Sequence, residues 1–155
     1  MKKIQFLAVL SALLFTSVQL SAQTAMEWTD HGIGFSVPDD FSIVTNTGEE
    51  FTAVNEHVFL TMAPIQDETI TEDNLAEAVV EMAKELEYDV VDEADAIDID
   101  DFTGYYVKGT LGSAHAVVMA LMDTESSTNL LVIIAYDKGY ENEALKIAAS
   151  FYAFD

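Results

Sequence analysis

The chain has 155 residues, no cysteine and no arginine, and its 28 acidic residues against six lysines give a formal net charge of −22. A chain without cysteine has no disulfide, thiol nucleophile, cysteine metal site or lipid-bearing cysteine, and so anionic a protein repels nucleic acid and anionic membrane surfaces. The partners that this charge attracts are basic protein surfaces, cationic peptides and divalent cations.

The first 22 residues have the order of a bacterial secretory signal. Met1-Lys2-Lys3 is positive, an apolar stretch follows to about Val18, and Leu20-Ser21-Ala22 ends in small residues. The apolar stretch is shorter than the roughly 20 residues of a membrane-spanning helix. We therefore expect cleavage after Ala22 and export of a single domain, residues 23–155, to the periplasm or the medium. That domain keeps 28 acids and four lysines, with no membrane insertion.

Short strands are predicted over the first third of this domain. Residues 27–29 and 34–37 flank a turn at Asp30-His31-Gly32, and residues 41–44, 51–54 and 58–63 have extended patterns that turns or Pro64 end. In the last of these, apolar residues alternate along one face, as in a half-buried strand.

A helix is predicted next. Thr69 and Glu72 have the spacing of a capping box, and a single apolar stripe follows at helical spacing: Leu75, Val79, Met82, Ala83 and Leu86. The opposite face is acidic, so packing must hold the helix.

The second half predicts an antiparallel meander and a closing helix. Residues 90–100 alternate, as in a strand with one solvent-exposed face or an edge strand guarded by charge. The apolar runs 114–122 and 130–136 are typical of central strands covered on both faces. The connections 102–104 and 123–129 are too short for parallel crossovers, and residues 144–151 have a helical stripe. The fold class is therefore α+β, an antiparallel β-sheet covered by helices in an α/β/α sandwich.

This order of elements resembles the PsbP-like superfamily, which includes the Mog and DcrB-type proteins. The similarity covers residues 28–151 and includes the segments Gly34-Phe35-Ser36-Val37-Pro38 and Ile147-Ala148-Ala149-Ser150-Phe151. The chain differs from DcrB-type lipoproteins in lacking a lipidation cysteine, and from Mog proteins in its predicted export. The resemblance implies a non-enzymatic scaffold that binds another protein, and it transfers no catalytic residue.

An acidic cluster is the candidate metal site. Asp95, Asp98, Asp100 and Asp101 could supply some of the oxygens that Ca²⁺ or Mg²⁺ prefers, although Thr103 stands where an EF-hand loop counted from Asp98 needs glycine. A solvated strand face explains the same residues. The sequence predicts no other cofactor.

No catalytic constellation is found. His31, His57 and His115 are far apart in sequence, and Ser113 near His115 lacks a nucleophile elbow. We therefore expect an exported, non-enzymatic binding or assembly domain that engages another protein. The alternatives are a small hydrolase with an unlocated acid pair, which a pocket with converging polar groups would favour, and a weak divalent-cation-binding module.

Overall fold

The computed structural model describes residues 22–125 and 129–154. The predicted signal peptide lies outside the described residues, except for Ala22. Within the described residues, no helix has the length and apolar character needed to cross a membrane.

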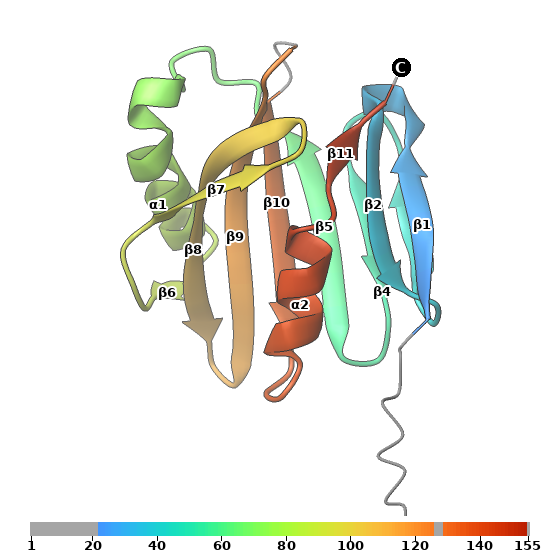
Figure 1. Ribbon diagram of the computed structural model, residues 1–155. Coiled ribbons are helices and arrows are strands. Elements are labelled where there is room, and N and C mark those ends of the chain that lie inside the picture. The colour runs from blue at the N-terminus through green and yellow to red at the C-terminus, as the bar shows by residue number, and fades with distance from the viewer. Residues whose placement is uncertain (1–21, 126–128, 155) are drawn as a thin grey trace, which may run out of the picture.

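Two antiparallel sheets form the molecule (Figure 1). The small sheet has the order β1 (Gln23–Trp28), β2 (Ile33–Pro38), β11 (Tyr152–Ala153). The large sheet has the order β3 (Ser42–Asn46), β4 (Phe51–Val54), β5 (Val58–Pro64), β10 (Asn129–Tyr136), β9 (Ala114–Asp123), β8 (Phe102–Leu111), β6 (Asp89–Val90), and β7 (Asp95–Ile99) also pairs with β8. The helices are α1 (Leu75–Glu85) and α2 (Glu141–Ala148), with single 3-10 turns at Thr29–His31 and Glu72–Asn74.

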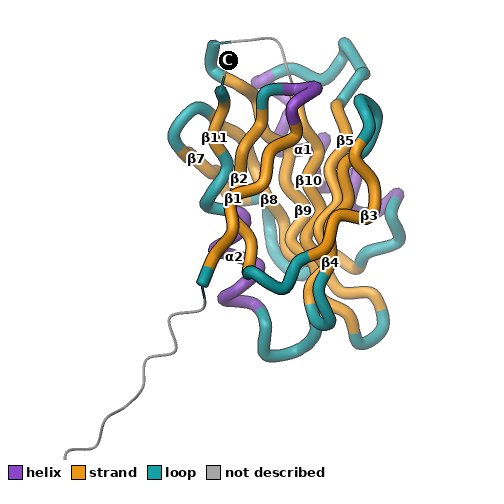
Figure 2. The backbone as a smooth tube through the Cα atoms, turned by 90° about the vertical axis from the view of Figure 1, so that its right-hand side faces the viewer, coloured by secondary structure: helices purple, strands orange, loops and turns teal. Residues whose placement is uncertain are grey.

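The elements stack in three layers, which Figure 2 shows from the side. On one face of the large sheet, α2 and the small sheet enclose the main core, in which the largest fully buried side chains are Trp28, Phe35, Phe51, Phe102 and Phe151. On the other face, α1 packs on β8 and β9 through Leu75, Val79 and Ala83. The predicted α+β sandwich is confirmed.

Of the two strands predicted to be covered on both faces, β9 is buried as expected and β10 is buried on one face only. Strand β9 is buried on both faces from residue 116 to 121, as its continuous apolar run predicts. Strand β10 alternates between buried and half-buried residues, because α1 contacts β8 and β9 and leaves the neighbouring face of β10 less covered.

Two details of α1 differ from the sequence prediction. The capping box is formed by Thr71 and Asn74, whose Oδ1 accepts the Thr71 N–H at 2.8 Å, because Thr69 instead donates its hydroxyl to Asp67 at 2.6 Å. The helix ends at Glu85, and Leu86, expected in the apolar stripe, is 39% exposed. The chain turns away there through Glu87, at a φ of +68°.

Candidate functional site

A shallow hollow lies between α1 and the chain that leaves β6. It has a volume of about 650 Å³ and is lined by Ala76, Glu77, Val80, Val90, Val91, Asp92, Glu93 and Ala94. We call these residues the α1–β6 groove. Ala76 and Val80 are one turn apart on α1, on the side next to its buried stripe. The sequence that packs α1 on the sheet therefore also gives the groove an apolar wall.

The groove has an apolar floor and an acidic rim. Val91 is 60% exposed at its mouth, whereas Glu77, Asp92 and Glu93 on the rim are exposed carboxylates. A single exposed valine is ordinary, but Val91 continues the apolar lining formed by Ala76, Val80, Val90 and Ala94. An apolar patch with a polar rim is typical of an interaction site.

Ion pairs elsewhere occupy two of the lysines. Lys84 contacts Glu81 at 3.0 Å, and Lys108 contacts Glu141 at 2.6 Å. The hydrogen bond in the second pair lowers the pKa of Glu141 and raises the pKa of Lys108. Among the described residues, no lysine or histidine forms an ion pair with the rim carboxylates of the groove. The rim carboxylates are therefore able to form ion pairs with a cationic group of another molecule.

The four aspartates of the candidate metal site lie along and just after β7. Asp95 and Asp98 are exposed, and Asp100 has a φ of +26° in the turn to β8. Asp101 is half-buried, and its Oδ2 accepts the N–H of Ala153 at 2.8 Å, which ties this turn to β11. In the described part of the chain, no three histidine, aspartate or glutamate side chains form a group that could hold a metal ion. Weak Ca²⁺ or Mg²⁺ binding here stays a prediction.

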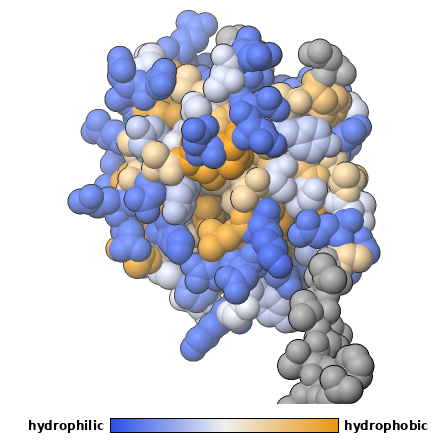
Figure 3. All heavy atoms as spheres, in the orientation of Figure 1, coloured by the Kyte–Doolittle hydropathy of each residue, from blue (hydrophilic) through white to orange (hydrophobic). Residues whose placement is uncertain are grey.

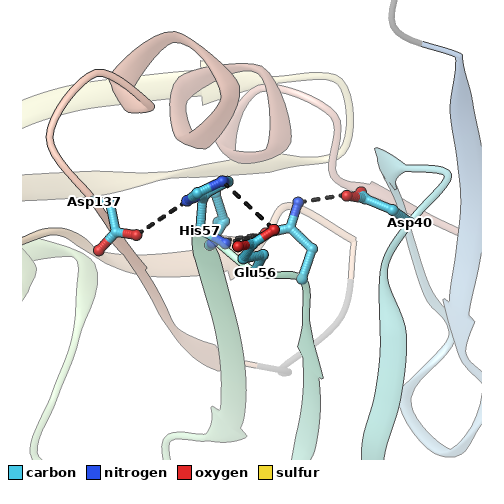
Figure 4. Close-up of polar contacts among 6 residues, drawn as sticks. Asp40, Glu56, His57 and Asp137 are labelled. Atoms are coloured by element: carbon cyan, nitrogen blue, oxygen red, sulfur yellow. Dashed lines mark hydrogen bonds and ion pairs between the residues drawn. The ribbon is translucent and has the colours of Figure 1, made fainter.

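A second hollow surrounds His57, at the start of β5 (Figure 4). The Nδ1 atom of His57 lies 3.2 Å from Oδ2 of Asp137, and Nε2 lies 3.9 Å from the exposed carboxylate of Glu56. The imidazole stacks on Tyr140 with ring centroids 4.1 Å apart. Asn55 accepts the backbone N–H of His57 at 2.9 Å and donates to Asp40 at 3.1 Å.

This second hollow holds the His57 imidazole between two carboxylates and an aromatic ring. Its volume is about 240 Å³, and its lining is Ala22, Pro38, Asp39, Asp40, Asn55, His57, Tyr140 and Glu143. Among the described residues, the imidazole of His57 contacts two carboxylates and the Tyr140 ring, and Asn55 accepts only its backbone N–H. Nucleophilic catalysis by a serine, threonine or cysteine needs that hydroxyl or thiol within hydrogen-bond reach of the base, and the ring nitrogens of His57 lie next to carboxylates instead. The arrangement therefore fits a structural clamp between β5 and the start of α2.

The other two histidines have structural contacts. His31 places Nε2 2.7 Å from the carbonyl oxygen of Gly48 and meets the ring of Trp28 edge-on. His115 stacks on Tyr136 with centroids 5.6 Å apart. None of the three histidines contacts another in the described residues, as their separation in sequence leads us to expect.

The sequence did not reveal the groove or the closest partner of His57. Glu56, its neighbour in sequence, lies farther from it than Asp137, which is 80 residues away. Val91 stood beside acids in a predicted edge strand, and its pairing with exposed α1 residues depends on the tertiary fold. The available signal was the apolar Val90-Val91 pair directly before three acids within four residues.

Apolar atoms also gather on the face shown in Figure 3, between β7 and α2, with hydrophilic residues around them. Ile97 and Ile99 of β7, Tyr106 of β8 and Leu145 of α2 are partly buried and pack against the main core. These contacts close the core at that face and leave the α1–β6 groove as the better candidate for binding.

No protein-family model matches the chain, and no curated protein matches it in sequence. Among solved structures, it is similar to the Ran-binding protein Mog1p of Saccharomyces cerevisiae, with a TM-score of 0.61 and 14% identity over 87% of this chain and 97% of Mog1p. It is also similar to LpqN, involved in cell envelope biogenesis of Mycobacterium tuberculosis, with a TM-score of 0.51 and 12% identity over 86% of this chain and 91% of LpqN. Both belong to the Mog1/PsbP/DcrB superfamily. At these identities, the likeness shows that this chain shares their fold.

Proposed function

We propose that this chain is an exported, non-enzymatic domain that binds another protein through the α1–β6 groove. The observation that carries this proposal is the combination of an open apolar floor with a rim of unpaired carboxylates. A partner that fits presents an apolar side chain to Val80 and Val91 and lysine or arginine to the rim. A few aromatic and arginine side chains usually contribute most of the affinity of an interface.

The structural neighbours support a binding role. Mog1p is described as Ran-binding, and LpqN as involved in cell envelope biogenesis. We do not assign Ran binding or envelope biogenesis to this chain, since the likeness is one of fold. The envelope role of LpqN agrees with the export that residues 1–22 predict.

The two alternatives have less support. A hydrolase with a protein nucleophile needs a hydroxyl or thiol hydrogen-bonded to its base, whereas the described polar partners of the His57 ring nitrogens are the carboxylates of Asp137 and Glu56. A cation-binding module needs converging oxygens, whereas Asp101 uses one carboxylate oxygen to hold β11. The groove offers an apolar surface instead of converging polar groups, which favours macromolecular binding over catalysis.

Site-specific photo-crosslinking in the producing cells tests the proposal. A photoreactive amino acid replaces Val91, which is 60% exposed in the groove, and the matched control replaces Leu111, which is 46% exposed at the end of β8. We expect one discrete protein adduct at Val91 and none at Leu111. Reversing the charge of the rim with Glu77→Lys and Asp92→Lys should abolish the adduct. Equal adducts at both positions, or none at Val91, would contradict the proposal.

A further inference from the structure

Strand β3 is the end of the large sheet. It pairs with β4 through residues 42, 43, 45 and 46, and no further strand of residues 22–125 or 129–154 follows it in the sheet order. Within the described residues, no other backbone group pairs with residues 42–46. Its second edge therefore presents free N–H and C=O groups, which is the template that an additional strand needs.

This edge lacks the charged side chains that usually protect such strands. The residues Ser42-Ile43-Val44-Thr45-Asn46 are uncharged, and Ile43 and Val44 are 51% and 64% exposed. At the other side of the sheet, β7 carries Asp95 and Asp98. A bulge between Ile43 and Thr45 adds local twist to this edge. The twist hinders pairing with the edge of a flat sheet, whereas a single flexible segment can follow it.

Acidic residues flank both ends of β3. Asp39 and Asp40 precede it, and Glu49 and Glu50 lie in the turn that follows it. Among the described residues, their side-chain hydrogen bonds come from neutral groups, namely Thr24 to Asp39, Asn55 to Asp40 and Thr52 to Glu50. In the described part of the chain, no lysine or histidine forms an ion pair with these four carboxylates. An uncharged edge thus lies between two regions of negative charge.

We propose that β3 accepts an extended segment of a partner protein as an added strand, with β-branched residues beside Ile43 and Val44 and with lysine or arginine at both ends. Backbone hydrogen bonds would give the affinity and the flanking charges would give the selectivity. A second copy of this chain fits poorly, because pairing of two β3 strands in either direction places acidic flanks against acidic flanks. This surface is independent of the α1–β6 groove, which lies beside β6 at the other end of the sheet order.

Synthetic peptides test this inference directly. The first has alternating valine and threonine between two pairs of lysines, the second has glutamate in place of each lysine, and the third has proline in place of the central valine. We expect the lysine peptide to bind and to slow hydrogen exchange of the amides in residues 42–46. The glutamate and proline peptides should bind at least about tenfold more weakly, because like charges repel and proline cannot donate to the new ladder.

Two pairs of variants keep the test specific. Neutralising the flanks should weaken binding of the lysine peptide at least about tenfold; the substitutions are Asp39→Asn, Asp40→Asn, Glu49→Gln and Glu50→Gln. The matched control removes the same charge from exposed acids away from β3 and should bind as the unmodified protein does; these substitutions are Glu68→Gln, Glu72→Gln, Asp73→Asn and Glu85→Gln.

The second pair of variants adds a lysine, either to β3 itself or to an exposed position on β8. Val44→Lys adds a charge to the edge and should abolish binding of the lysine peptide, whereas Leu111→Lys, at an exposed apolar position on β8, should not. Circular dichroism checks that each variant is folded. Equal losses in variant and control, protection outside residues 42–46, or a dimer that Val44→Lys dissociates would overturn the inference.

Discussion

Leu75 and Leu86 belong to one apolar pattern in the sequence, but the structure places them in different surroundings. Leu75 is 1% exposed and packs with Val107 and Val118 under α1, whereas Leu86 is 39% exposed at the end of the helix. Leu75→Ala removes three carbons worth about 0.8 kcal/mol each and leaves a cavity, so we expect a loss of about 3–5 kcal/mol in the free energy of unfolding.

Leu86→Ala should cost much less. About 60% of the Leu86 side chain is buried, so Leu86→Ala loses about 60% of the transfer free energy of the three carbons. Water fills the space they leave and no cavity forms, so the expected loss is about 1.5 kcal/mol. Glu81→Gln is the surface control: its ion pair with Lys84 is exposed on both sides, so we expect a change within about 0.5 kcal/mol.

Urea unfolding followed by the fluorescence of Trp28 measures these differences. Trp28 is the single tryptophan and is fully buried in the main core, so its emission should report unfolding of the whole domain if the transition is two-state. Equal losses for Leu75→Ala and Leu86→Ala would show that the end of α1 is buried, and would refute the reasoning.

Three further predictions concern charge, packing and maturation. The melting temperature should rise with sodium chloride as screening weakens repulsion among the acids; an additional, saturable rise with millimolar calcium that Asp98→Asn with Asp100→Asn removes would establish a cation site, and insensitivity to both salts would refute the argument from charge. Gly104→Ala should destabilise by at least about 2 kcal/mol in urea, because a Cβ there would lie 2.0 Å from the carbonyl oxygen of Ala120, and a neutral result would contradict the β8–β9 packing. Mass spectrometry of the cellular protein should find a chain that begins within a few residues of Gln23, whereas an intact Met1 would end the prediction of export.

Local patterns predicted most of the strands and both helices. The run 114–122 gave the central strand β9, and the stripe Leu75, Val79 and Ala83 gave the buried face of α1, because apolar periodicity responds directly to burial. The end of α1 was not predicted, since Leu86 continues the periodicity and only the positive φ of Glu87 ends it. The capping box moved by two residues because Asp67 competes for the Thr69 hydroxyl.

The candidate site was less predictable than the fold. Its two walls come from α1 and from the chain after β6, and the sequence gives no measure of how closely they approach. The sheet order is also set by long-range contacts. The distant strand β10 pairs with β5, at one side of the β3–β4–β5 meander, and β3 at the other side is left as an open edge. Long-range strand pairing of this kind leaves no periodic signal in a single sequence.

The most direct test of the account is an amide chemical-shift map of the isotope-labelled protein, titrated with the partner captured at Val91. We expect the largest shifts in residues 76–80 and 90–94, which form the α1–β6 groove. Val91→Asp should reduce these shifts at equal partner concentration, because it replaces the apolar side chain at the mouth of the groove with a carboxylate. Shifts centred on His57, or no shifts at saturating partner, would contradict the claim that this domain binds a protein through the groove.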